Sequence, residues 1–191
     1  MIIGITGGTG CGKTTALQAI RELGGMVIDC DALYHDLLRT DPSLLRAVEA
    51  RFPGTVTEGV LDRKALAAIV FSDKQALLEL NAITHSAVRN AVRALLRSKP
   101  KLAAIDAIEL FDGGLSDDCD VTVAVTAPEE DRIHRLLGRD AITREQALLR
   151  IQAQKPEHYF REKCDYILEN SGTQEEFWEK CLAFFRKLII I

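Results

Sequence analysis

A glycine-rich segment near the N-terminus constrains the fold most strongly. Residues 7–14 read Gly-Gly-Thr-Gly-Cys-Gly-Lys-Thr and fit the pattern G-x-x-x-x-G-K-[ST] at every fixed position. The β-branched run Ile2–Thr6 precedes the segment, and residues 13–23 follow it with apolar residues at helical spacing. A strand, a glycine loop and a helix N-terminus together form a cradle for phosphate groups. We therefore expect a nucleoside triphosphate to bind here.

Each position of this loop has an expected task. Glycines allow the backbone to curl so that successive N–H groups face one centre. The nucleotide is expected to contact the loop and the start of the helix at Gly8, Gly10, Cys11, Gly12, Lys13, Thr14 and Thr15. Lys13 would reach the β- and γ-phosphates, the Thr14 hydroxyl would ligate Mg²⁺, and Thr15 would face the α-phosphate. The alternative is a chance glycine-rich turn, which the strand–loop–helix context disfavours.

The rest of the chain alternates between strand and helix patterns. The predicted strands are residues 2–6, 26–30, 102–108, 121–125 and 166–168. The predicted helices are residues 13–23, 32–39, 44–52, 63–96 in two parts, 129–138, 144–154 and 174–188. This alternation predicts a three-layer α/β/α fold with a five-stranded parallel sheet. We expect a single domain, 1–191, with its core at about 1–60 and 100–191, a helical insertion at about 61–98 and a further short helical segment at about 132–155.

Charge and cysteine usage exclude several classes of protein. The net charge of −4 and the pI of about 5.6 give no global basic field for nucleic acid or a membrane surface. The five cysteines include no C-x-x-C pair, so a disulfide framework or a zinc site is not expected. No signal-peptide pattern opens the chain. We expect a cytoplasmic protein that is a monomer or a weak homo-oligomer.

Further segments narrow the class of phosphate-binding protein. They are Val27-Ile28-Asp29-Cys30-Asp31, Leu61-Asp62-Arg63, Val70-Phe71, Leu80-Asn81-x-x-x-His85, Leu110-Phe111-x-x-Gly114-Leu115, Arg135-x-x-x-Arg139-Asp140, Gln154 and Asn170. With the glycine loop, they give the chain a resemblance to the dephospho-CoA kinase family over nearly its whole length. The resemblance implies a P-loop kinase that uses ATP and Mg²⁺ to phosphorylate the ribose 3′-hydroxyl of dephospho-CoA. It also implies that the helical insertion at about 61–98 is acceptor-binding and that the short helical segment at about 132–155 is a lid.

The residue that would accept the proton of the acceptor hydroxyl follows the second predicted strand. Open α/β sheets place ligands at the carboxyl ends of their strands, where Asp31 lies. The resemblance implies that Asp31 is the catalytic base and contacts the acceptor. The alternative role is an N-cap of the next helix, to which aspartate is well suited, and the two roles can coexist. Asp29 is expected to orient water or Mg²⁺.

A row of arginines follows Pro128. Arg132, Arg135 and Arg139 share one helix face because they are spaced i, i+3 and i+7. They could form a solvated surface, but in a P-loop kinase such a row closes onto the phosphates as a lid. We expect Arg135 to bind nucleotide and Arg139 to act in catalysis with Lys13, and we regard Arg132 as the weakest candidate of the row.

The resemblance also implies acceptor contacts at Thr6, Arg63 and His85. Arg63 could pair with the acceptor's diphosphate, whereas a histidine at position 85 could equally be a partly buried, hydrogen-bonded side chain. The chain departs from the family pattern in this area. His35 stands where the family usually has arginine, Ser86 replaces proline, and residues 108–112 read Ile-Glu-Leu-Phe-Asp in place of P-L-L-F-E.

Two alternatives stay open at this point. One is another small-molecule or nucleoside-monophosphate kinase that uses the same loop and lid. The other is a switch or a non-catalytic nucleotide-binding protein, although the N-K-x-D segment of a guanine-specific switch is absent.

Overall fold

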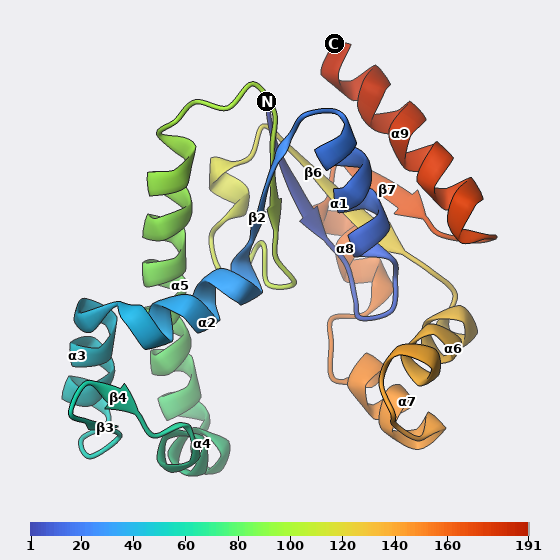
Figure 1. Ribbon diagram of the computed structural model, residues 1–191. Helices are drawn as coiled ribbons and strands as arrows, with labels where there is room; N and C mark the ends of the chain where they lie inside the picture. The colour runs from blue at the N-terminus through green and yellow to red at the C-terminus, as the bar shows by residue number, and fades with distance from the viewer. Residues whose placement is uncertain (191) are drawn as a thin grey trace.

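The protein is built around one parallel sheet. The computed structural model describes residues 1–190. Five parallel strands lie in the order β2 (Met26–Asp29), β5 (Ala103–Asp106), β1 (Ile2–Thr6), β6 (Val121–Thr126) and β7 (Tyr166–Glu169). β1, which leads into the glycine loop, is therefore the central strand. The predicted three-layer fold with a five-stranded parallel sheet is confirmed, and helices flank the sheet in Figure 1.

Both faces of the sheet are covered because successive strand residues point to opposite sides. On one face, Ile3 and Ile5 pack against α1 (Lys13–Glu22) and α9 (Gln174–Ile190), which contributes the buried Phe177 and Phe185. On the other face, Ile105 packs against Val92 of α5 (Lys74–Leu96). The short α8 (Glu157–Lys163) contacts β6 and β7, and the 3₁₀ turn η1 (Ser116–Asp118) precedes β6.

A group of helices extends beyond the carboxyl end of β2 and has a core of its own. It comprises α2 (Cys30–Thr40), α3 (Pro42–Arg51), α4 (Arg63–Ser72) and part of α5. Its core includes Leu38, Val48, Phe52, Leu66 and Leu80. In space, α2 and α3 thus pack with α4 and α5, and we call residues 30–96 the helical region. The narrower insertion at 61–98 stays a prediction.

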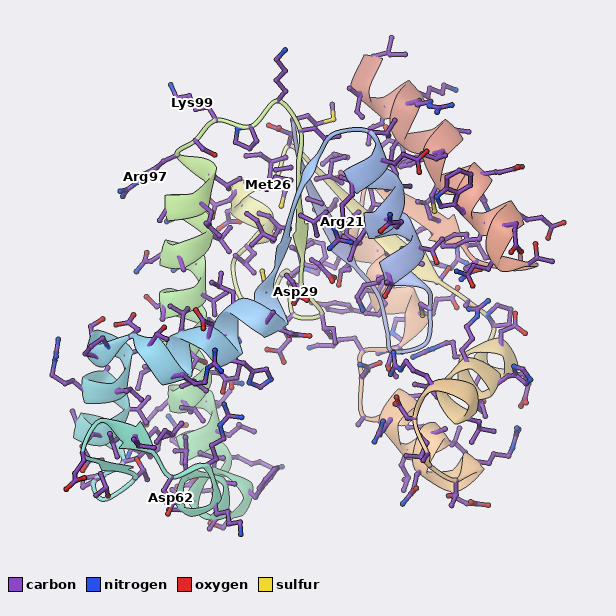
Figure 2. The ribbon with its side chains drawn as sticks, viewed as in Figure 1. Arg21, Met26, Asp29, Asp62, Arg97 and Lys99 are labelled. Atoms are coloured by element: carbon purple, nitrogen blue, oxygen red, sulfur yellow. The ribbon has the colours of Figure 1, made fainter. Side chains whose placement is uncertain are left out.

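Aspartates begin the helices of this region. Asp29, Asp41, Asp62 and Asp73 each accept hydrogen bonds from backbone N–H groups in the first turn of α2, α3, α4 and α5. In Figure 2, Met26 and Asp29 mark the two ends of β2, and Asp62 lies at the far end of the helical region. Asp29, not Asp31, is the N-cap of α2, so the expectation that Asp31 caps this helix is wrong.

A helical hairpin lies on the other side of the sheet's carboxyl edge (Figure 1). It consists of α6 (Glu129–Arg139) and α7 (Arg144–Gln152), which pack through Ile133, Leu136, Ala147 and Ile151. A capping box between Thr143 and Gln146 begins α7. We call α6 and α7 the α6–α7 hairpin.

One small sheet and one short α-helix of the structure were not predicted. β3 (Val56–Thr57) and β4 (Val60–Leu61) form a small antiparallel hairpin in the turn region before α4, and α8 was not recognised. Both are short, so their sequences carry little periodicity. Within residues 1–190, no helix is both long and apolar enough to span a membrane.

Candidate functional site

The glycine loop has a conformation that other residues would strain. Gly7, Gly10 and Gly12 have φ values of 136°, 76° and 100°, in the region that favours glycine. A Cβ at Gly7 would lie 2.2 Å from the carbonyl oxygen of Val125, so space is also lacking there. Within the described chain, no side chain caps the N-terminus of α1. The first amides of α1 are therefore available to an anion.

Side chains from distant parts of the sequence hold this loop in place. Asn170 Nδ2, just after β7, donates to the Cys11 carbonyl at 2.9 Å. On the other side, Gln154 Oε1 accepts from the Thr9 N–H at 2.7 Å. Cys11 is only 3% exposed and burial raises the pKa of its thiol, so its contribution to a ligand is limited to its backbone. Hydrogen bonds from two distant side chains thus hold the loop from both sides.

The three arginines of α6 differ in position. Arg132 Nε donates to the Thr9 carbonyl at 2.9 Å, and its guanidinium packs so closely on Gly8 that a Cβ there would lie 2.4 Å from Nη2. Arg135 and Arg139 instead line the cavity above the loop. Arg135 Nη1 donates to the Gly10 carbonyl at 3.1 Å, while Arg139 is 63% exposed and pairs with Asp140 at 2.8 Å. The structure thus places Arg132 behind the loop and the other two over it.

We call the space above the loop the phosphate cavity. It has a volume of about 380 Å³. It is lined by the glycine loop, Lys13, Thr14, Asp29, Asp31, Asp106, Ile108, Arg135, Leu136 and Arg139. Lys13 Nζ donates to the Gly7 carbonyl at 2.9 Å, which keeps the ammonium over the loop. Three cationic side chains, Lys13, Arg135 and Arg139, thus line the same cavity as the three carboxylates Asp29, Asp31 and Asp106.

Thr15 does not line the phosphate cavity. With Thr14, Gln18, Gln174, Glu175 and Trp178, it lines a separate groove of about 370 Å³ between α1 and α9. Thr14 lines both spaces, so the groove adjoins the phosphate cavity at the start of α1.

Asp106 is a residue of the site that the sequence analysis missed. It ends β5, where it lies in register with Asp29 of β2 and Ile5 of β1. Burial raises the pKa of Asp106 to about 6, and Oδ1 has no hydrogen-bond partner among the described residues. The available signal was a carboxylate that ends an apolar strand, Ala-Ala-Ile-Asp, at the carboxyl edge of the sheet.

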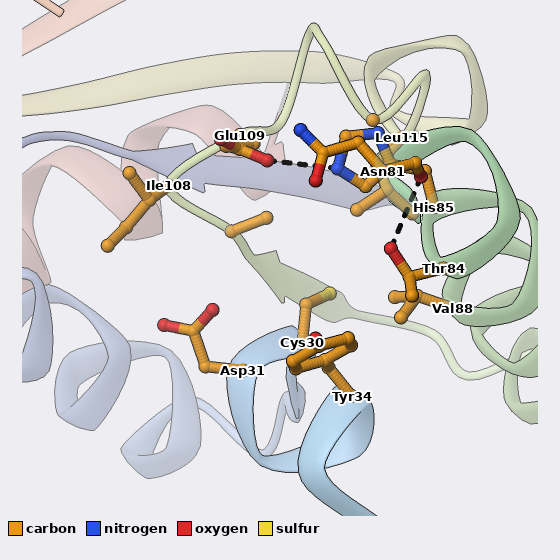
Figure 3. A pocket seen from close by; sticks show the side chains of 12 residues that line it. Cys30, Asp31, Tyr34, Asn81, Thr84, His85, Val88, Ile108, Glu109 and Leu115 are labelled. Carbon is orange, nitrogen blue, oxygen red and sulfur yellow. Dashed lines mark hydrogen bonds and ion pairs between the residues drawn. The ribbon is translucent and has the colours of Figure 1, made fainter. Parts of the chain in front are cut away.

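A second cavity opens between α2, α5 and the loop after β5, and we call it the acceptor cavity. It has a volume of about 360 Å³. Its lining consists of Cys30, Asp31, Tyr34, Asn81, Thr84, His85, Val88, Ala107, Ile108, Glu109, Gly113 and Leu115. Figure 3 shows Asp31 and Tyr34 on one side and Asn81, His85 and Glu109 across from them. Asp31 and Ile108 line both cavities, so Asp31 lies at the boundary between them.

The residues expected at the acceptor lie at different depths. His85 lines the acceptor cavity, and its Nε2 lies 2.9 Å from Glu109 Oε2. Arg63 is exposed at the start of α4 and does not line the cavity. It does lie near Tyr34, which lines the cavity: burial raises the pKa of Tyr34, and the charge of Arg63 opposes that rise. Thr6 is 0% exposed and its hydroxyl donates to the Ile108 carbonyl at 3.1 Å, so it lies beneath the cavity wall.

Comparison with known proteins identifies the family. The model of the dephospho-CoA kinase family matches residues 1–176. Dephospho-CoA kinases from Geobacillus kaustophilus and Deinococcus radiodurans are 36% and 38% identical to this chain. Each match covers 98% of this chain, and the matches cover 96% and 92% of the two relatives.

Solved structures agree with this fold. The protein TT1252 from Thermus thermophilus superposes with a TM-score of 0.80 at 35% identity, over 98% of this chain and 97% of that one. A shikimate kinase from Bacteroides thetaiotaomicron, at 14% identity and a TM-score of 0.61 over 100% and 99% of the two chains, shares the fold alone. The match to the family model and the similarity to relatives over nearly their full length show that the chain belongs to the dephospho-CoA kinase family, as its motifs predict.

Proposed function

We propose that this chain transfers the γ-phosphoryl group of ATP to the ribose 3′-hydroxyl of dephospho-CoA, giving coenzyme A and ADP. The observation that supports this most directly is the position of Asp31, which lines both the phosphate cavity and the acceptor cavity. A carboxylate at this boundary can meet an acceptor hydroxyl on one side and the γ-phosphate on the other. Family membership supplies the identity of the acceptor.

The phosphate cavity provides positioning and charge neutralisation, on which phosphoryl transfer mainly depends. The loop amides and the N-terminus of α1 hold the phosphates. Lys13, Arg135 and Arg139 line the same cavity and face the charge that develops on the transferred group. Lys13 lies at the start of α1 and Arg139 at the end of α6, so movement of the α6–α7 hairpin would change how tightly this charge is enclosed.

Asp31 is proposed as the general base. Its carboxylate accepts the proton of the 3′-hydroxyl while that oxygen forms a bond to the γ-phosphorus. The bond between the γ-phosphorus and the β–γ bridging oxygen breaks, and its electron pair leaves with ADP. Asp31 can act in this way because the cap of α2 is supplied by Asp29, which leaves the Asp31 side chain free of that role.

Mg²⁺ is proposed to bind beside Thr14 and Asp106. No three histidine, cysteine, aspartate or glutamate side chains within residues 1–190 are grouped closely enough to form a metal site alone. This suits Mg²⁺ in a kinase, since the ion keeps several waters and takes further ligands from the phosphates. Asp106 fits because its buried Oδ1 has no partner among the described residues and Asp106 and Thr14 line one cavity. The ion would neutralise charge on the β- and γ-phosphates.

The acceptor-side residues have supporting roles in this proposal. His85 would contact the acceptor from the cavity wall. Arg63 would pair with its diphosphate from outside the cavity, near Tyr34. Thr6 would act indirectly, because its hydroxyl donates to the carbonyl of Ile108 and so positions a residue that lines the cavity.

The direct test measures ADP release with ATP and Mg²⁺, with and without dephospho-CoA, followed by identification of coenzyme A as the product. We expect release to depend on both dephospho-CoA and Mg²⁺. Transfer to nucleoside monophosphates but not to dephospho-CoA would contradict the proposal. For the metal, Asp106→Asn should reduce the thermal stabilisation that Mg²⁺–ATP gives beyond that of ATP alone, a readout independent of turnover.

We also propose that the protein works in the cytoplasm as a monomer or weak homo-oligomer. Five free cysteines, three of them buried, suit a reducing compartment. Light scattering over a range of protein concentrations tests the assembly state, and a tight oligomer at the lowest concentration would contradict it.

A further inference from the structure

The acceptor cavity carries more negative than positive charge. Two carboxylates, Asp31 and Glu109, line it, whereas no lysine or arginine does. Its one basic side chain, His85, is already paired with Glu109. Two like charges 4 Å apart repel by about 4 kcal/mol near a protein surface. The diphosphate of an acceptor would therefore be unfavourable in this cavity.

The position of the reacting hydroxyl then decides which part of the acceptor enters. The 3′-hydroxyl must lie at Asp31, on the cavity boundary. From the ribose, the base and the 5′-diphosphate extend in different directions. Since the diphosphate is excluded by charge, the base is the part that enters the space between α2 and α5. This space of about 360 Å³ falls within the size range of ligand sites.

The walls of the cavity suit a flat heterocycle with a polar edge. The Tyr34 ring lines one side, and Cys30, Val88 and Leu115 add apolar surface. Glu109 lies across from Tyr34 in Figure 3. Glu109 Oε2 contacts His85, while the described residues offer no donor to Oε1. That oxygen can accept a hydrogen bond from a ligand.

We infer that Glu109, oriented by His85, determines acceptor specificity by accepting a hydrogen bond from the exocyclic 6-amino group of the acceptor's adenine base. The 6-amino group is the hydrogen-bond donor that adenine presents beside its N7 acceptor. The inference rests on the proposed function, because it assumes an adenosine 3′-hydroxyl as the phosphoryl acceptor. The hydrogen bond from His85 also lowers the pKa of Glu109, which keeps its carboxylate ionised as an acceptor. Glu109 stands within the segment where the chain departs from the P-L-L-F-E pattern, so this contact is a property of this chain's own sequence.

The test compares dephospho-CoA with its analogue in which purine replaces adenine, so that only the 6-amino group is missing. A hydrogen bond to a charged group contributes enough that we expect kcat/KM to fall ~10–100-fold for the analogue with the unchanged protein. In Glu109→Leu the two acceptors should differ by less than ~3-fold, and Glu109→Gln should be intermediate because its carbonyl still accepts. The loss should appear in KM for the acceptor, with KM for ATP unchanged.

Controls separate the possible failures. Glu162→Leu, on the exposed face of α8, should keep the discrimination of the unchanged protein. Equal use of both acceptors by the unchanged protein, or undiminished discrimination in Glu109→Leu, would overturn the inference and leave the proposed function intact. Absence of transfer to dephospho-CoA by the unchanged protein would overturn the proposed function, and this inference with it. The first comparison needs no variant, so it holds even if a substitution prevents folding.

Discussion

The phosphate cavity and the acceptor cavity are built in different ways. The glycine loop is one continuous segment that binds through backbone amides, and Asn170, Gln154 and Arg132 hold it in place. The acceptor cavity is assembled from side chains of α2, α5 and the loop after β5, which are far apart in the sequence. The form of the phosphate cavity therefore depends mainly on backbone geometry, whereas the form of the acceptor cavity depends on tertiary packing. Asp31 belongs to both, and substitutions can separate their contributions.

The largest effect is expected at the shared residue. Asp31→Asn should lower kcat by ~10³-fold, because a general base typically contributes 10²–10⁴-fold. The Asp31 side chain does not cap α2, so thermal stability should change little. Steady-state kinetics with both substrates test this. Asp36→Asn, on the exposed face of the same helix, is the matched control, and a similar kcat for both variants would contradict a catalytic role for Asp31.

The next largest effect is expected on the phosphate side alone. Lys13→Ala should reduce kcat by ~10²–10³-fold, the range for removing one group that stabilises developing charge. The fold should persist because the hydrogen bond of Nζ that the structure shows goes only to the Gly7 carbonyl. Rates of ADP release measure the effect, with Lys187→Ala on the exposed face of α9 as control. If Lys13→Ala weakened acceptor binding alone, the assignment of separate roles to the phosphate cavity and the acceptor cavity would be wrong.

A substitution behind the glycine loop should act on stability. Asn170→Ala removes the side chain that donates to the Cys11 carbonyl and leaves this buried carbonyl unpaired. We expect the free energy of unfolding to fall by about 1–3 kcal/mol. Urea unfolding measures this, and ATP affinity should decline with it while acceptor KM stays constant. An unchanged midpoint of urea unfolding would show that the stability of the loop does not depend on the hydrogen bond from Asn170.

The smallest effect is expected in the acceptor cavity. His85→Ala should raise KM for dephospho-CoA by ~10-fold, as expected when one hydrogen-bonded contact to a charged group is lost. KM for ATP should stay the same because His85 does not line the phosphate cavity. Kinetics at saturating ATP measure the change. Ser86→Ala, on the exposed neighbour of His85, should leave both constants unaltered, and equal effects of the two variants would argue against a contact at His85.

The sequence was sufficient for the parts of the molecule that depend on local pattern. The strand, loop and helix around Lys13 follow from adjacent residues, and the sheet follows from alternating strand and helix patterns. Tertiary packing determined the rest. No periodicity brings Tyr34 and Glu109 to one cavity, and the spacing of Arg132 does not reveal that it packs behind the loop. Asp106 was missed because it resembled an ordinary strand end, and its unpartnered oxygen is visible only in three dimensions.

The tie between Asn170 and Cys11 has a consequence for synthesis on the ribosome. The side chain of Asn170, which holds the glycine loop from the edge of the sheet, is made 159 residues after Cys11 of that loop. The central strand β1 must likewise wait for β5 and β6 before its neighbours exist. Contacts so distant in sequence close late. The nascent chain therefore completes its nucleotide-binding loop only after the residues that follow β7 have been translated, although the motif itself is made much earlier.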